Sequence, residues 1–163
     1  MTLLRFDYPE AIGPVDDRVR ALLPACAHYG RSDLPLFAAG YTELCRVDLS
    51  GQRVLELCCG FGELALRLAR AFPRAEVIAL DRYPEAGEAI RSAQDHKECS
   101  NARYQCGDAL NLSDFQEGSL DLVYGQATLH HLAHDTDRLR KEMARVLKPG
   151  GRLESLNSEI LSC

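Results

Sequence analysis

The chain has 163 residues, of which 46% are hydrophobic and 26% are charged, and its formal net charge is −5. This size and composition predict one globular domain with a substantial hydrophobic core. The negative charge excludes the basic surface typical of proteins that bind nucleic-acid backbones, and no apolar run approaches the ~20 residues of a membrane-spanning helix.

The seven cysteines are odd in number and form no Cys-x-x-Cys pair, so we interpret them as reduced thiols, mostly in the core. The first residues, Met1 to Asp7, lack the charged-then-apolar pattern of a signal peptide. Both features predict a cytoplasmic protein. The pair Cys58-Cys59 could be a redox or metal element, but no Cys or His accompanies it at ligand spacing, so we expect no metal.

Residues 1–48 predict a helical segment that precedes the main fold. Pro14 can occupy the first turn of one helix, and a second helix is expected from Leu34 to about Arg46. This segment could simply cover one edge of a sheet. It could instead form a lid over a ligand site, with Tyr8 or Tyr41 as a polar contact.

The stretch Val54–Gly62 organises the rest of the chain. A hydrophobic run ends in a turn of small residues, and residues 63–71 follow with apolar positions at helical spacing. This pattern predicts a buried strand, a tight turn and a helix. Glycines let the backbone approach a ligand closely, and a helix N-terminus offers unpaired N–H groups. The stretch therefore predicts a site for a nucleotide-like ligand, although an ordinary strand-to-helix turn has the same pattern.

Short apolar strands then alternate with helices along the chain. Further strands are expected at 75–81, 101–106, 120–125 and from Arg152, and helices at 84–94 and 133–147. Between the last helix and strand, Lys148–Gly151 has proline and glycine at the two central positions of a type II turn. The alternation predicts an α/β fold, a doubly wound parallel sheet with helices on both faces.

Acidic residues are associated with three successive strands of this sheet. Glu56 lies in the first strand, Asp81 ends the second and Asp108 follows the third. Ligands of open α/β sheets bind at the carboxyl ends of the strands. An acid that ends the second strand can accept both hydroxyls of a ribose, although capping a helix is the commoner role of a single Asp.

Five segments resemble, in the same order, the motifs of class I S-adenosylmethionine-dependent methyltransferases: Val54–Gly62, Asp81, Gly107–Ala109, Leu122–Leu132 and Arg145–Leu153. The resemblance implies a Rossmann-like core over residues 49–163, S-adenosylmethionine as the cofactor and a small-molecule methyl acceptor. The sulfonium of this cofactor is already electrophilic, so the protein must mainly align the acceptor atom.

The resemblance also implies roles for single residues. Glu56 matches the acid that hydrogen-bonds toward the methionine amino group, directly or through water. Gly60 and Gly62 match the glycines against which the cofactor packs. Asp81 matches the acid that accepts from the ribose hydroxyls.

Further matches concern the adenine and the methionine ends. Asp108 matches the acid that accepts from the adenine amino group, and the Ala109 N–H matches the donor to the ring. Gln126 matches the position beside the methionine part. His130 and His131 match a pair common in the small-molecule branch of the family, and either could be a general base, although packing or capping also fits.

This sequence departs from the family in three respects. Cys58 stands where the family usually has its first glycine, so a side chain intrudes at the turn. Arg82 stands where an apolar residue usually covers the adenine, a role that the Arg stem could take. The family's sheet has seven strands, and this chain ends at about the fifth. We therefore expect the last two strands to be missing, and the open edge of the fifth to permit self-association.

Two alternatives remain from the sequence. A NAD-dependent oxidoreductase requires Gly-x-Gly-x-x-Gly after the first strand, and the segment Cys58–Ala65 lacks the third glycine. The other alternative is a truncated or degenerate homologue that binds the cofactor or a partner without turnover.

Overall fold

The computed structural model describes residues 44, 47–95, 99–126, 128 and 132–156. Nearly all of the helical segment expected over residues 1–48 lies outside these residues, and so do His130 and His131. Among the helices of the described residues, none is long and apolar enough to cross a membrane.

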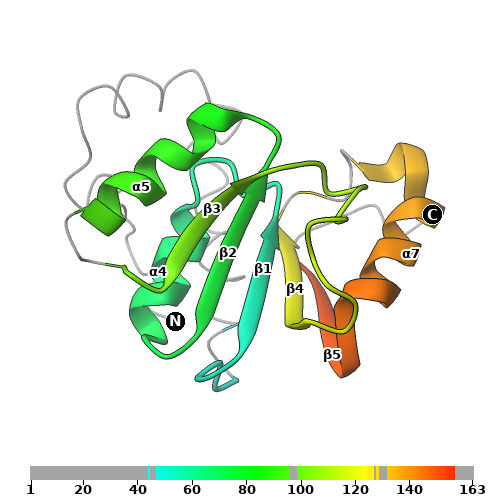
Figure 1. Ribbon diagram of the computed structural model, residues 1–163, viewed down its shortest axis with the longest axis horizontal. Helices are drawn as coiled ribbons and strands as arrows, with labels where there is room; N and C mark the ends of the chain where they lie inside the picture. The colour runs from blue at the N-terminus through cyan, green and yellow to red at the C-terminus, as the bar shows by residue number, and fades with distance from the viewer. Residues whose placement is uncertain (1–43, 45–46, 96–98, 127, 129–131, 157–163) are drawn as a thin grey trace, which may run out of the picture.

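A five-stranded sheet forms the centre of the fold (Figure 1). Its strands, in the spatial order β3-β2-β1-β4-β5, are β1 (Arg53–Leu57), β2 (Glu76–Asp81), β3 (Ala102–Cys106), β4 (Leu120–Gln126) and β5 (Leu147–Leu156). Every neighbouring pair is parallel. The strand order reverses between β1 and β4, which is the switch point at which such sheets bind ligands.

Helices cover both faces of the sheet (Figure 1). The elements are α4 (Glu63–Ala71), α5 (Glu88–Asp95) and α7 (Thr136–Val146), with 3-10 turns η2 (Pro84–Gly87) and η3 (Ala133–Asp135). Helices α4 and α5 pack on one face, and α7 packs on the other. The predicted doubly wound, Rossmann-like α/β fold is therefore confirmed.

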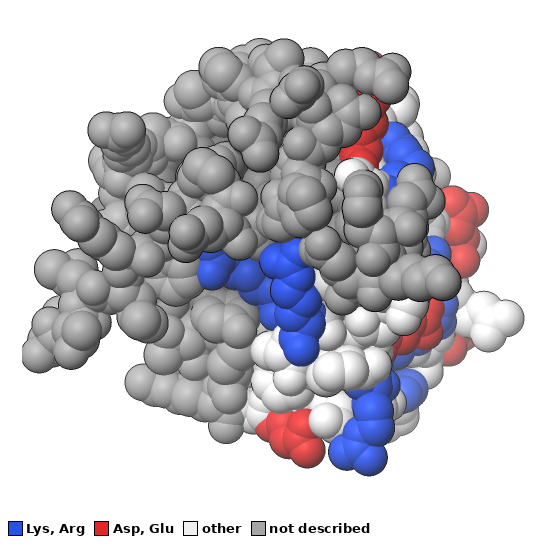
Figure 2. Space-filling view, turned by 90° about the vertical axis from the view of Figure 1, so that its left-hand side faces the viewer, with Lys and Arg blue, Asp and Glu red and all other residues white. Residues whose placement is uncertain are grey.

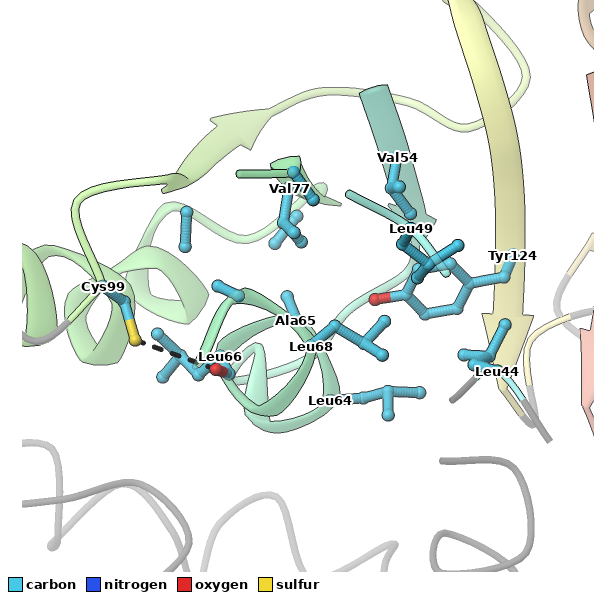
Figure 3. Close-up of a cluster of buried hydrophobic side chains, with 14 of the residues drawn as sticks. Leu44, Leu49, Val54, Leu64, Ala65, Leu66, Leu68, Val77, Cys99 and Tyr124 are labelled. Carbon is cyan, nitrogen blue, oxygen red and sulfur yellow. Dashed lines mark hydrogen bonds between the residues drawn. The ribbon is translucent and has the colours of Figure 1, made fainter. Parts of the chain in front are cut away.

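The two hydrophobic clusters follow from the alternation of side chains along each strand. In β1, Val54 belongs to the cluster under α4, whereas Leu55 and Leu57 belong to the cluster under α7. A strand covered on both faces must be apolar on both, which explains the continuous hydrophobic run at this point. Figure 3 shows the Tyr124 ring extending from β4 toward Leu49 within the cluster under α4.

Asn101, just before β3, holds the C-terminal end of α4. Its side-chain nitrogen lies 3.0 Å from the Ala69 oxygen, 3.1 Å from the Phe72 oxygen and 3.0 Å from the Ala75 oxygen. The last carbonyls of a helix have no partner within the helix, so this amide satisfies the Ala69 carbonyl and ties the end of α4 to the chain that follows it.

The last elements differ from the predicted boundaries. The helix expected at 133–147 consists of η3 followed by α7, and β5 begins at Leu147 instead of Arg152. Leu120 of β4 pairs with Leu147, and Leu122 pairs with Arg152, so the intervening residues bulge out of the strand. Gly150 there has φ 80°, as the third residue of a type II turn requires. The predicted turn is thus present, but it lies inside β5.

Charged side chains of both signs are interspersed over the described residues of the face that Figure 2 shows. A group of three charged residues joins three strands near their beginnings. Glu76 of β2 pairs with Arg53 of β1 at 3.0 Å and with Arg103 of β3 at 3.2 Å. These exposed pairs contribute little to stability individually.

Candidate functional site

The turn after β1 has the left-handed backbone that the sequence predicts. Cys58 has φ 51°, Gly60 has φ 54° and Gly62 has φ 72°. Cys58 is the only non-glycine residue with positive φ among those that the structure describes. A left-handed backbone costs a residue with a side chain about 1 kcal/mol or more, so glycine would be the less strained residue at this position.

Hydrogen bonds fix this turn against its neighbours. The Gly62 N–H donates to the Cys59 carbonyl at 2.9 Å, and the Cys59 N–H donates to the Leu80 carbonyl of β2 at 3.0 Å. A Cβ at Gly62 would lie 2.8 Å from Cγ1 of Ile90 in α5. A side chain at this position would therefore force the buried Ile90 side chain to shift, and the positive φ of Gly62 would add backbone strain.

Glu56 is a buried carboxylate, 4% exposed, that points toward α4. Its Oε2 accepts a hydrogen bond from the Ala65 N–H at 3.0 Å. Gly62, the N-cap residue of α4, provides no side-chain cap, so Glu56 takes over that function and places a negative charge at the positive end of the helix. Its cross-strand neighbour Tyr124 is buried, and the pKa of this phenol is raised by burial and then by the Glu56 charge.

Asp81 ends β2 and is only 9% exposed. Its Oδ2 accepts from the Gly60 N–H at 3.0 Å, and its Oδ1 accepts from the Tyr83 N–H at 3.2 Å. A carboxylate has about four lone-pair sites, so each oxygen of Asp81 can still accept a ligand hydroxyl.

Asp108 forms a tight turn after β3. Its Oδ1 accepts from the Leu110 N–H at 2.9 Å, and its carbonyl accepts from the Asn111 N–H at 2.8 Å. Asp108 is exposed, whereas the adjacent Ala109 is buried. The turn therefore presents a carboxylate to solvent beside an anchored backbone.

Cys58 is partly buried, and the charges of the predicted site residues act on its thiol. Burial raises the pKa of this thiol to about 12, and its charged neighbours are three carboxylates that raise it and one guanidinium that lowers it: Asp81, Arg82, Asp108 and Glu56. The thiol is therefore protonated at neutral pH. The parallel pairing of β3, β2 and β1 places their carboxyl ends side by side, and the Gly60–Asp81 hydrogen bond joins the ends of β1 and β2.

Thr128 is a residue that the sequence reasoning missed. Its hydroxyl, which is buried, donates to the Leu57 carbonyl at 3.1 Å and so ties the segment after β4 to the end of β1. Gly125 permits this approach, because a Cβ there would lie 3.1 Å from the Thr128 Cβ. The only sequence signal is a small hydroxyl residue just after a glycine-containing strand. Gln126, expected just after the fourth strand, is the last residue of β4.

A family model described as a methyltransferase domain matches residues 54–151. The chain belongs to this methyltransferase family. The match spans β1 to the turn inside β5, so it contains the described site. It confirms the resemblance to class I methyltransferases and overturns the oxidoreductase alternative.

Curated relatives carry the same family name. The chain is 39% identical over 108 residues to a phthiotriol/phenolphthiotriol dimycocerosates methyltransferase of Mycobacterium leprae, covering 66% of this chain and 38% of the relative. It is 37% identical over 110 residues to a ubiquinone biosynthesis O-methyltransferase of Xanthomonas oryzae pv. oryzae, covering 66% and 44%. The chain thus spans about two-fifths of the length of these relatives.

A solved structure agrees in fold. The geranyl diphosphate C-methyltransferase of Streptomyces coelicolor A3(2), solved with Mg²⁺, geranyl-S-thiolodiphosphate and S-adenosyl-L-homocysteine, superposes with a TM-score of 0.63 at 20% identity. The match covers 72% of this chain and 42% of that one. At this identity the likeness shows the fold of the methyltransferase core.

Proposed function

We propose that the chain binds S-adenosylmethionine at the carboxyl ends of β1, β2 and β3 and serves methyl transfer to a small-molecule acceptor. The observation that carries this proposal is the Asp81 carboxylate at the end of β2, which accepts from the Gly60 N–H and keeps lone pairs for a ligand. Membership of the methyltransferase family supports the reaction. The similarity to a ubiquinone biosynthesis O-methyltransferase supports a small acceptor.

Each residue of the site has a function in this proposal. Asp81 accepts from the ribose hydroxyls, Asp108 accepts from the adenine amino group, and the Ala109 N–H donates to the ring. The exposed Arg82 covers the base with its stem while its charge remains in water.

The remaining contacts concern the methionine part. The turn from Cys58 to Gly62 lies beneath the cofactor, Glu56 supports this turn through α4, and Gln126 lies beside the amino-acid end. Bound S-adenosylmethionine supplies the electrophilic methyl group. The protein's contribution is to bind, orient and exclude water. The general base, His130 or His131 if one is needed, stays a prediction.

Calorimetry with S-adenosylhomocysteine tests the proposal, because this product binds without reacting. We expect one ligand per chain and no binding of NADH to the same protein. A methyl-acceptor screen with radiolabelled S-adenosylmethionine and a panel of phenols, quinols and carboxylic acids then tests turnover. A folded protein that binds neither the cofactor nor its product would contradict the proposal. Binding without any methylated product would favour the second candidate, a homologue without turnover.

A further inference from the structure

The segment between β3 and β4, residues 107–119, contains no helix or strand of its own. It nevertheless contributes buried side chains to the cluster under α7: Ala109, Leu110, Leu112 and Phe115. Asp108 and Ala109, which the proposed function assigns to the adenine, lie at the start of this segment. Something must therefore hold an irregular backbone in place beside the base.

Two charged residues of α7 bind the middle of this segment. The Leu112 N–H donates to Oε2 of Glu142 at 2.7 Å, and the Leu112 carbonyl accepts from Nη2 of Arg145 at 2.7 Å. Nη1 of Arg145 donates to the Phe115 carbonyl, also at 2.7 Å. Both backbone groups of one residue are thus bound by one pair of side chains.

The same two side chains bind each other. Nη2 of Arg145 lies 2.7 Å from Oε2 of Glu142, and Nε lies 3.2 Å from Oε1. These bonds hold the pKa of Glu142 below its usual value. A guanidinium fixed in this way presents its remaining donors in one orientation, which a flexible ammonium cannot do.

The bound segment lies next to the turn of Asp108. Asn111, the neighbour of Leu112, donates its N–H to the Asp108 carbonyl at 2.8 Å, and the Phe115 N–H donates to the Leu112 carbonyl at 2.8 Å. Two consecutive turns therefore connect the α7 contacts to the Asp108 carboxylate. The end of the segment is also attached to α7, since the Gly118 N–H donates to the Arg145 carbonyl at 2.8 Å.

We propose that Glu142 and Arg145 are positioning residues for recognition of the adenine, acting through the backbone of residues 108–115. This inference rests on the proposed function. Neither side chain contacts the cofactor. In this proposal the pair fixes the position of the Asp108 turn relative to the Asp81 carboxylate. One ligand can then place its adenine at Asp108 and its ribose at Asp81.

Amide hydrogen exchange tests the structural half of this inference without any ligand. In Arg145→Lys we expect the N–H groups of Leu110, Asn111 and Phe115 to exchange about tenfold faster, because a compact ammonium lacks the spread donors with which the guanidinium holds several acceptors at once. The amides of β1 should keep their protection. Exchange of residues 108–115 that matches the wild type would overturn the inference.

Ligand discrimination tests the functional half. The probes are S-adenosylhomocysteine and S-inosylhomocysteine, in which a carbonyl replaces the adenine amino group. We expect Arg145→Lys to weaken binding of the adenosine ligand by about tenfold, the effect of losing roughly one charge-assisted hydrogen bond, and to reduce the preference for adenine. Glu142→Gln should act in the same direction with a smaller effect. Arg140→Lys, on an exposed position of the same helix, is the matched control.

The outcomes separate the inference from the proposed function. Equal weakening of both ligands, with the preference unchanged, would mean that the pair only stabilises the fold, and would overturn the inference. A wild-type protein that binds neither ligand would overturn the proposed function and the inference with it. If Arg145→Lys does not fold, the test uses Glu142→Gln, which keeps the shape of the side chain. A reduced preference of this variant for S-adenosylhomocysteine over S-inosylhomocysteine would support the inference, and an unchanged preference would overturn it.

Discussion

The Gly60 N–H donates to the Asp81 carboxylate over 3.0 Å and so joins the turn after β1 to the end of β2. The two residues belong to two separate motifs of the sequence, 21 positions apart. In the structure they form one unit, because the carboxylate that we assign to the ribose also holds the backbone beneath the cofactor. Substitutions of Asp81 are therefore expected to affect both the binding of the ribose and the conformation of the turn after β1.

Asp81→Ala should lower the affinity for S-adenosylhomocysteine by about tenfold or more, since lost acceptors for buried hydroxyls cost roughly 1–3 kcal/mol. Asp81→Asn, which keeps one acceptor oxygen, should retain part of the affinity. Calorimetry on the folded variants measures both values, with Asp137→Ala, at an exposed position of α7, as the control. Unchanged affinity in Asp81→Ala would refute the ribose assignment.

Cys58→Gly should bind the cofactor as well as the parent or better. Glycine removes a left-handed strain of about 1 kcal/mol at this position, where φ is 51°. Cys59→Gly is the matched control, because Cys59 has no positive φ and packs against the cluster under α4, so it should lose thermal stability. A clear loss of binding in Cys58→Gly would instead indicate that the sulfur packs usefully at the site.

Glu56→Gln should lower the thermal stability of the protein without ligand, by about 1 kcal/mol for a weakened helix cap. We expect this substitution to weaken the binding of S-adenosylhomocysteine and of methylthioadenosine by the same factor, because the Glu56 carboxylate binds the N-terminus of α4. Methylthioadenosine lacks the amino-acid part. A loss confined to S-adenosylhomocysteine would show that Glu56 contacts the methionine amino group.

Acid should weaken the contact between α7 and residues 107–119. The pKa of Glu142 is lowered from 4.5 by its hydrogen bonds to Arg145, so its contribution to stability is complete above about pH 4.5. That contribution is lost as the pH falls through the lower pKa of the folded state. Urea unfolding between pH 7 and pH 3 should show a smaller loss for Glu142→Gln than for the wild type. Glu117→Gln, at an exposed position, should follow the wild type.

Self-association through β5 stays a prediction with a direct test. No strand of the described residues pairs with the outer edge of β5, and Leu153 on that strand is 49% exposed. Light scattering over a concentration series should show a rise in mass that Leu153→Lys abolishes. Val47→Lys, at an exposed apolar residue outside β5, should leave the rise intact. A constant monomer mass would contradict the prediction.

Sequence reasoning predicted those parts of the site that follow from local chemistry. The positive φ at Gly60 and the acid Asp81 at a strand end are readable from a turn motif and a short apolar run. Contacts between distant segments are not readable in this way: the Thr128 hydroxyl binds a carbonyl 71 residues away, and the Arg145 guanidinium binds carbonyls 30 and 33 residues away. No spacing rule marks a side chain that binds remote backbone.

The bound ends of α4 have a consequence for the order of folding. This helix has nine residues, too few to persist alone in water. Glu56 caps its beginning from nine positions before Ala65, but Asn101 completes its end from 32 positions after Ala69. During synthesis α4 can therefore begin to form early. It becomes fully stable only after Asn101 has emerged from the ribosome and β3 has joined the sheet.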